Sequence, residues 1–150
     1  MELKIKALSP KLGKEIPFPS YATAGSAGMD LRACVDEPVT VAPGQRVAIP
    51  TGFAIALPDP GWVALIYARS GLAVKHGLAP ANCVGVVDSD YRGEIVVALQ
   101  NYAGEEYTIQ PGERVAQMVI TPVTQARIDV VEELDETARG AGGFGSTGKA

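Results

Sequence analysis

Hydrophobic and polar positions alternate along most of this chain, in short runs that are typical of β-strands. The pattern predicts strands over residues 3–8, 29–35, 47–57, 62–68, 84–87, 95–102, 114–120 and 126–131. Proline and glycine separate these runs at Pro43-Gly44, Pro58-Asp-Pro-Gly61 and Pro111-Gly112, where tight turns are favoured. Many short strands with closely spaced turns indicate an all-β jelly-roll sandwich or barrel.

The pattern allows one short helix and one region without periodicity. The helix is expected to begin near Ser70, a natural N-cap, and to end at Gly77. Residues 135–150 are glycine-rich and have no apolar period, so we predict a core over residues 1–134 followed by a mobile C-terminal tail. Two nucleotide-binding patterns in this tail, G-x-G-x-x-G and a near-Walker A, lack the strand and helix that they need.

Composition narrows the function classes. The net charge of −4 argues against a sequence-independent grip on a nucleic acid polymer, although a single nucleotide needs only a few local cations. One histidine and two separated cysteines make a structural zinc site a poor interpretation. The sequence contains neither a leader pattern nor a long apolar run, so we expect a cytoplasmic protein that does not bind membranes.

The segment from Asn82 to Glu94 is predicted to form a β-hairpin that can present backbone N–H and C=O groups to a flat ligand. Its turn contains Gly93, which is free to adopt a positive φ. Asp88 would stand at the mouth of the hairpin and Tyr91 across its opening. The residues alone do not distinguish a catalytic base from a spectator, because Asp88 and Asp90 share a face of a regular strand. An Asn82 amide would serve either a turn or the edge of a base.

Three other places carry polar groups that suit an anion or a metal, and each also has a structural interpretation. Ser70, after Arg69, is either a helix cap or part of an anion site. Asp30 satisfies turn amides or holds a hydrated Mg²⁺. The tail around Arg139 is either a flexible terminus or a wrap for polyphosphate, and the isolated ring of Phe144 favours the second.

One internal repeat concerns two turns that lead into strands. Pro43-Gly-Gln-Arg-Val-Ala48 resembles Pro111-Gly-Glu-Arg-Val-Ala116. We interpret the shared residues as a recurrent turn solution in two halves of a sandwich. The position that is polar only in the second copy, Gln117 opposite Ile49, is the better functional candidate.

The order of these motifs resembles the five ordered motifs of the trimeric dUTPases. They are Ala27-Gly-Met-Asp-Leu31, Arg69-Ser-Gly71, Gly85-Val-Val-Asp-Ser-Asp-Tyr-Arg-Gly93, Gly112-Glu-Arg-Val-Ala-Gln117, and the glycine-rich run from Arg139 to Gly148. The resemblance implies a jelly-roll homotrimer with sites at subunit interfaces. It also implies Mg²⁺-dependent hydrolysis of dUTP to dUMP and pyrophosphate, which keeps uracil out of DNA and supplies dUMP for thymidylate synthesis.

The resemblance also implies roles for individual residues. Asp88 becomes the base that activates water, and Asp30 contacts the metal through water. Substrate contacts are implied at Arg69, Ser70, Gly71, Asn82, Gly85, Val87, Tyr91, Gln117, Arg139, Phe144, Gly145 and Ser146. Tyr91 would stack under deoxyribose, and Phe144 would close over uracil. The alternatives are a dCTP deaminase of related fold, which would release ammonia, and a non-catalytic jelly-roll binding module.

Overall fold

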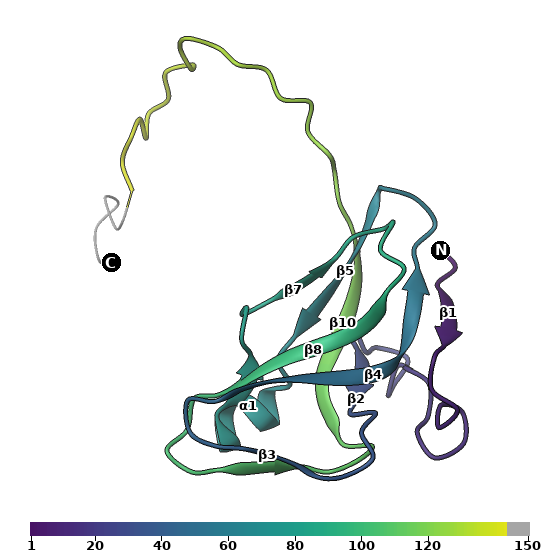
Figure 1. Ribbon diagram of the computed structural model, residues 1–150. Coiled ribbons are helices and arrows are strands. Elements are labelled where there is room, and N and C mark those ends of the chain that lie inside the picture. Colours follow the sequence, from purple (N-terminus) through teal and green to yellow (C-terminus); the bar gives the residue numbers. More distant parts are fainter. Residues whose placement is uncertain (144–150) are drawn as a thin grey trace.

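Two four-stranded antiparallel sheets form the body of the chain in the computed structural model, which describes residues 1–143 (Figure 1). The strand order of the first sheet is β1 (Lys4–Ala7), β4 (Arg46–Ala56), β8 (Glu94–Asn101) and β6 (Leu78–Pro80). The order of the second is β2 (Met29–Arg32), β10 (Arg114–Pro122), β5 (Trp62–Tyr67) and β7 (Gly85–Val87). A two-stranded ribbon joins β3 (Val39–Val41) to β9 (Tyr107–Ile109).

The hydrophobic core lies between the sheets because each strand turns alternate side chains inward. In β8, Ile95, Val97 and Leu99 are buried, while the intervening Val96 and Ala98 are exposed. Larger side chains from other strands complete the core, among them Leu31, Ile49, Phe53, Ile109 and Met118. The jelly-roll sandwich with one short helix predicted from the sequence is therefore confirmed.

The short helix α1 (Ser70–His76) ends as predicted and begins differently. Gly77 adopts a left-handed φ of 63° and its N–H bonds to helix carbonyls, which closes the last turn. At the other end, Arg69 occupies the N-cap position and makes no side-chain capping bond. The prediction that Ser70 caps the helix is wrong, because Ser70 is already the first helical residue.

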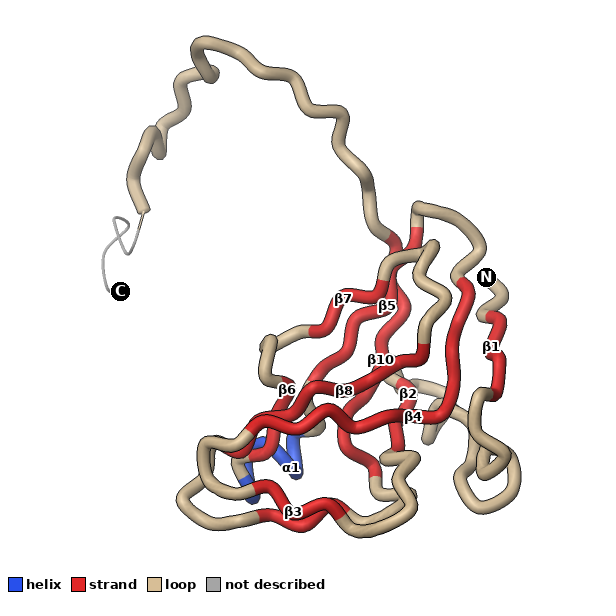
Figure 2. Tube along the Cα trace, viewed as in Figure 1, coloured by secondary structure: helices blue, strands red, loops and turns tan. Residues whose placement is uncertain are grey.

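The strand predicted over residues 126–131 is also wrong. After β10 the described chain leaves the sheets and continues as loop (Figure 2). We call residues 123–143 the C-terminal arm. Its alternating pattern is real, but Ile128 and Val130 are 85% and 90% exposed, because the arm has no neighbouring edge to pair with in the described chain.

Three strands were missing from the sequence prediction: β3, β6 and β9. Each has only three residues, too few to establish a period of two. Within residues 1–143 the structure contains no helix long and apolar enough to cross a membrane.

Candidate functional site

The consecutive strands β7 and β8 frame a cavity of about 230 Å³, which we call the hairpin pocket after the hairpin predicted for this segment. The strands that frame it belong to different sheets, since β7 pairs with β5 whereas β8 pairs with β4 and β6. The β-hairpin predicted for residues 82–94 is therefore wrong, because its two strands do not pair with each other. The pocket is lined by Ile66, Asn82, Gly85, Val86, Val87, Asp88, Tyr91, Glu94, Ile95 and Val96. It therefore brings together the five predicted residues of this segment, Asn82, Gly85, Val87, Asp88 and Tyr91.

Backbone polar groups are accessible at this pocket because β7 is the edge strand of its sheet. Among the described strands it pairs only with β5, with Gly85 opposite Ile66 and Val87 opposite Ala64. An edge strand leaves one row of N–H and C=O groups outside the ladder. Such a row, next to the side chains of Asn82 and Asp88, can recognise a planar heterocycle by hydrogen bonding.

The chain enters the pocket through a sharp turn at Cys83. This residue has a φ of 63°, the only positive φ of a non-glycine residue in the described chain. The N–H of Cys83 donates to the carbonyl of Pro80 at 3.1 Å, and the N–H of Val84 donates to the carbonyl of Asn82 at 2.7 Å. This turn fixes Asn82 at the rim of the pocket.

Tyr91 folds toward the start of β8, and Gly93 makes room for its ring. The Tyr91 hydroxyl donates to the carbonyl of Glu94 at 3.0 Å. A Cβ atom on Gly93 would overlap that hydroxyl oxygen. We expected Gly93 to adopt a positive φ, but it is not among the glycines that do. Glycine at this position leaves space for the Tyr91 ring, rather than supplying backbone freedom.

A second cavity, of about 480 Å³, lies where β2, β10 and the start of α1 meet. We call it the arginine pocket. Its lining includes the predicted residues Asp30, Arg69, Ser70, Gly71 and Gln117. In the register of the sheet Gln117 of β10 lies between Asp30 and Tyr67, and its side-chain amide donates to the carbonyl of Ala68 at 2.9 Å. The side chain of Gln117 is thus held at the end of β5.

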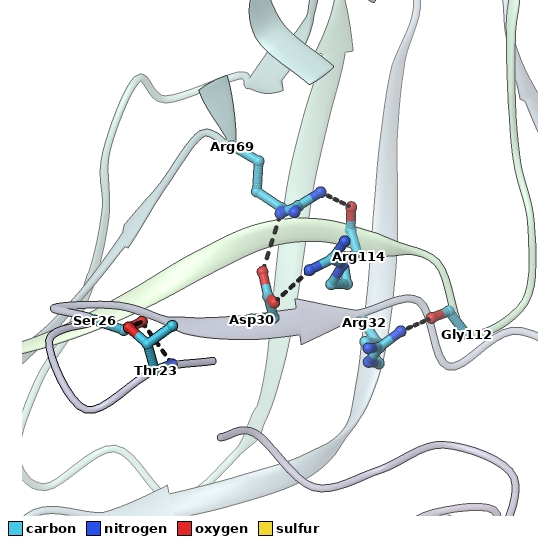
Figure 3. Close-up of polar contacts among 7 residues, drawn as sticks. All are labelled: Thr23, Ser26, Asp30, Arg32, Arg69, Gly112 and Arg114. Atoms are coloured by element: carbon cyan, nitrogen blue, oxygen red, sulfur yellow. Dashed lines mark hydrogen bonds and ion pairs between the residues drawn. The ribbon is translucent and has the colours of Figure 1, made fainter. Parts of the chain in front are cut away.

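Asp30 lies between two guanidinium groups in the arginine pocket (Figure 3). Its Oδ1 accepts a hydrogen bond from Arg69 Nε at 3.0 Å, and its Oδ2 accepts one from Arg114 Nη1 at 3.1 Å. Arg69 also donates to the carbonyl of Arg114 at 3.4 Å. Two cations against one carboxylate leave a net positive charge, which suits an anionic ligand.

Arg114 and Glu94 are site residues that the sequence interpretation missed. The Arg-Val-Ala of both repeats was assigned to turn structure, yet the two arginines have different partners. Arg46 of the first copy donates to Gln100 at 2.9 Å on the outside of the sandwich, whereas Arg114 reaches the pocket. The two repeats have the same residue type at positions 46 and 114, so comparing them does not reveal this difference. Of the site residues, the comparison indicates only Gln117, whose counterpart Ile49 is apolar.

Several predicted contacts are not brought together in the described chain. The hairpin pocket and the arginine pocket share no lining residue. Arg139 lies exposed in the C-terminal arm and lines neither pocket. Phe144, Gly145 and Ser146 lie outside the described residues. Residues 1–143 also contain no cluster of three or more histidine, cysteine or acidic side chains that could hold a metal ion by themselves.

Known proteins resemble this chain in both sequence and fold. The family profile for dUTPase matches residues 14–148. Deoxyuridine 5'-triphosphate nucleotidohydrolase of Hahella chejuensis is 56% identical over 146 residues, which cover 97% of this chain and 96% of the relative. The enzyme of that name from Acinetobacter baumannii is 54% identical over 149 residues, 99% of each chain.

Solved structures add a likeness in three dimensions. The Staphylococcus bacteriophage 80alpha dUTPase with dUPNHPP aligns with a TM-score of 0.86 at 28% identity and covers 99% of both chains. A second solved structure is that of a mutant dUTPase from phage phi11 of S. aureus, and it describes the coordination of a structural Mg(II) ion. It aligns with a TM-score of 0.76 at 26% identity and covers 89% of this chain and 98% of the phage chain. With a profile match that spans both pockets, and relatives above half identity along their whole length, the chain belongs to the dUTPase family.

Proposed function

We propose that this protein hydrolyses dUTP to dUMP and pyrophosphate. The observation that carries the proposal is the hairpin pocket, in which the Asp88 carboxylate and the Tyr91 ring line a cavity beside an unpaired strand edge, in a chain of this family. The product dUMP is the precursor of thymidylate, and removal of dUTP keeps uracil out of DNA. We place the reaction in the cytoplasm.

The hairpin pocket would hold the nucleoside. Its volume of about 230 Å³ suits a pyrimidine ring with part of its sugar, and backbone groups near Gly85 and Val87 would read the uracil edge. Cytosine carries an amino donor at C4, where uracil carries a carbonyl acceptor. Binding of cytosine would therefore leave buried polar groups unpaired, which disfavours it strongly. Tyr91 would lie under the deoxyribose and leave no space for a 2′-hydroxyl group.

The arginine pocket would hold the phosphates. Arg69 supplies charge, while Ser70, Gly71 and Gln117 supply neutral donors from a hydroxyl, a backbone N–H and an amide. Such groups lower the cost of bringing a polyanion near the attacking water.

A magnesium ion fits the arginine pocket only through water. Each Asp30 oxygen already accepts one hydrogen bond from an arginine and has capacity for one more, so a metal-bound water can donate to it. Mg²⁺ retains several waters and needs few protein ligands when phosphates are present, in agreement with a chain whose described residues form no acidic cluster. When bound, the ion would neutralise phosphate charge.

We further propose a homotrimer whose sites lie between subunits. The two pockets share no lining residue in the described chain, and in the proposed trimer the hairpin pocket of one subunit would meet the arginine pocket of another. The exposed apolar side chains of the C-terminal arm, Ile128 and Val130 among them, suit a contact with a second copy. Residues 1–134 would then be the core and residues 135–150 a lid, with Arg139 at the γ-phosphate and Phe144, Gly145 and Ser146 over the bound nucleotide.

Asp88 would act as the general base. Its carboxylate takes a proton from a water molecule, and the water oxygen bonds to the α-phosphorus as the bond to the oxygen that bridges the α- and β-phosphorus atoms breaks. The electron pair of that bond leaves with pyrophosphate, and dUMP retains the new oxygen. One base and well-placed donors suffice, since this chemistry depends on alignment and charge neutralisation more than on covalent help.

The test measures pyrophosphate release from dUTP beside dCTP, dTTP and UTP, with and without Mg²⁺. Asp88→Asn removes the base, and Asp90→Asn is the matched control, an exposed aspartate of the same turn. We expect Mg²⁺-dependent release from dUTP alone, lost in Asp88→Asn and kept in Asp90→Asn. Ammonia from dCTP would instead identify a deaminase, and tight binding of dUTP without turnover would identify a binding module.

A further inference from the structure

A bulge in β4 is hydrogen-bonded to the start of β8. The pairing of β4 with β8 shifts register between Pro50 and Ala54, so the residues between them are not in the regular ladder. Two of them bond to the start of β8 instead. The buried Thr51 hydroxyl donates to the carbonyl of Ile95 at 2.6 Å. The N–H of Gly52 donates to a carboxylate oxygen of Glu94 at 2.7 Å.

Glu94 is therefore bonded in two directions. Its side chain is fixed to β4 through Gly52, and its carbonyl accepts the hydroxyl of Tyr91 at 3.0 Å. Both Glu94 and Tyr91 line the hairpin pocket. A hydrogen bond to a charged acceptor is among the stronger ones that a partly buried site can form.

The position of the Tyr91 ring depends on this arrangement. Its hydroxyl reaches the Glu94 carbonyl only because Gly93 has no side chain, since a Cβ atom there would overlap the hydroxyl oxygen. Tyr91 is 46% exposed, so packing alone does not restrain it. The hydrogen bond to the Glu94 carbonyl restrains the ring, and the absence of a side chain at Gly93 leaves room for it.

We propose that Glu94 is a positioning residue that sets the Tyr91 ring and so contributes to the discrimination between deoxyribo- and ribonucleotides. This rests on the proposed function, in which Tyr91 lies under the sugar. The carboxylate touches no reacting atom. It acts by fixing the main chain at the point where the ring is anchored, and a small displacement of such a group is enough to change selectivity.

The test compares kcat/KM for dUTP and UTP in four variants. Glu94→Ala removes the bond to Gly52, and Glu94→Gln keeps an acceptor oxygen in place. Glu106→Ala is the control, an exposed glutamate in the turn between β8 and β9. We expect the preference for dUTP over UTP to fall by about tenfold in Glu94→Ala and to be retained in Glu94→Gln and Glu106→Ala. Gly93→Ala should lose preference in the same way, since it displaces the ring directly while leaving Glu94 intact.

The ring is also observed without turnover, by NMR of protein labelled in the tyrosine rings. The Tyr91 resonances should shift in Glu94→Ala and Gly93→Ala and stay in place in Glu94→Gln. Unchanged Tyr91 resonances in Glu94→Ala, or a wild-type dUTP preference in that variant, would overturn the proposal. The parent protein could also turn over no nucleotide while the Tyr91 resonances still shift in Glu94→Ala and Gly93→Ala. That result would support the positioning role and reject only the proposed function.

Discussion

Asparagine in place of Asp30 removes the negative charge that holds two arginines in the arginine pocket, and the two pairs should lose different amounts of stability. Their lengths are nearly equal, 3.0 Å to Arg69 and 3.1 Å to Arg114. Their exposure differs. The side chains of Asp30 and Arg69 are 23% and 27% exposed, whereas that of Arg114 is 44% exposed. Solvent screening should therefore weaken the Asp30–Arg114 pair.

The magnitude follows from these contacts. Exposed ion pairs contribute about 0.2–1 kcal/mol, and hydrogen bonds to charged groups about 1.5–3 kcal/mol. We place the partly buried Asp30–Arg69 pair near ~1.5 kcal/mol and the more exposed Asp30–Arg114 pair near ~0.5 kcal/mol. The order of the two values is the sharper prediction, because it depends only on burial.

The assay is a double-mutant cycle on the free energy of unfolding. Asp30→Asn is combined separately with Arg69→Gln and with Arg114→Gln, and each coupling energy is taken from urea unfolding. The chain concentration is held fixed, because the stability of an oligomer depends on it. High salt should reduce the Arg114 coupling more than the Arg69 coupling. Equal coupling energies, or a larger one at Arg114, would refute the argument from burial.

Three further predictions concern other parts of the chain. Asn101→Ala should lower the free energy of unfolding by ~3 kcal/mol, because the fully buried amide donates to the carbonyls of Val41 and Glu105 and accepts from the N–H of Ala103. A loss below ~1 kcal/mol in chemical denaturation would contradict this prediction. Burial and a hydrogen bond to Glu113 raise the pKa of Tyr107 from 10.0 to about 12. The contribution of the Tyr107 hydroxyl to the free energy of unfolding is therefore complete below pH 10 and is lost as the pH rises toward 12. In Tyr107→Phe, a tyrosinate titration by absorbance should lose its highest step. Deletion of residues 139–150 should abolish most turnover and leave the oligomer intact, and unchanged kinetics beside an unchanged gel-filtration volume would reject the lid.

The sequence predicted the elements whose residues interact locally. The strands β7 and β8 on either side of Asp88 and the end of α1 at Gly77 depend on residue pattern and on contacts within a few residues, whereas the pairing expected between those two strands does not form. Most of the predicted site residues in the described chain likewise gather in two pockets, because their motifs sit at strand ends that the sheets bring together.

What the sequence could not predict depends on where side chains and strand edges lie in three dimensions. The reason for Gly93 is the ring of Tyr91, which no backbone rule reveals. The role of Arg114 depends on its pairing with Asp30 across neighbouring strands, and the same letter at Arg46 pairs elsewhere. Alternation in the C-terminal arm indicated a strand, but a strand also requires an edge, and that information is not local.

The C-terminal arm also bears on the tendency of this chain to aggregate. Its exposed Ile128 and Val130 form the kind of alternating apolar segment that nucleates aggregation when strands from several chains meet. Charged residues interrupt that segment at Arg127, Asp129 and Glu132. They oppose stacking of like copies in register, because identical charges would then face one another. The arm thus carries charged residues that counteract the aggregation tendency of its apolar side chains.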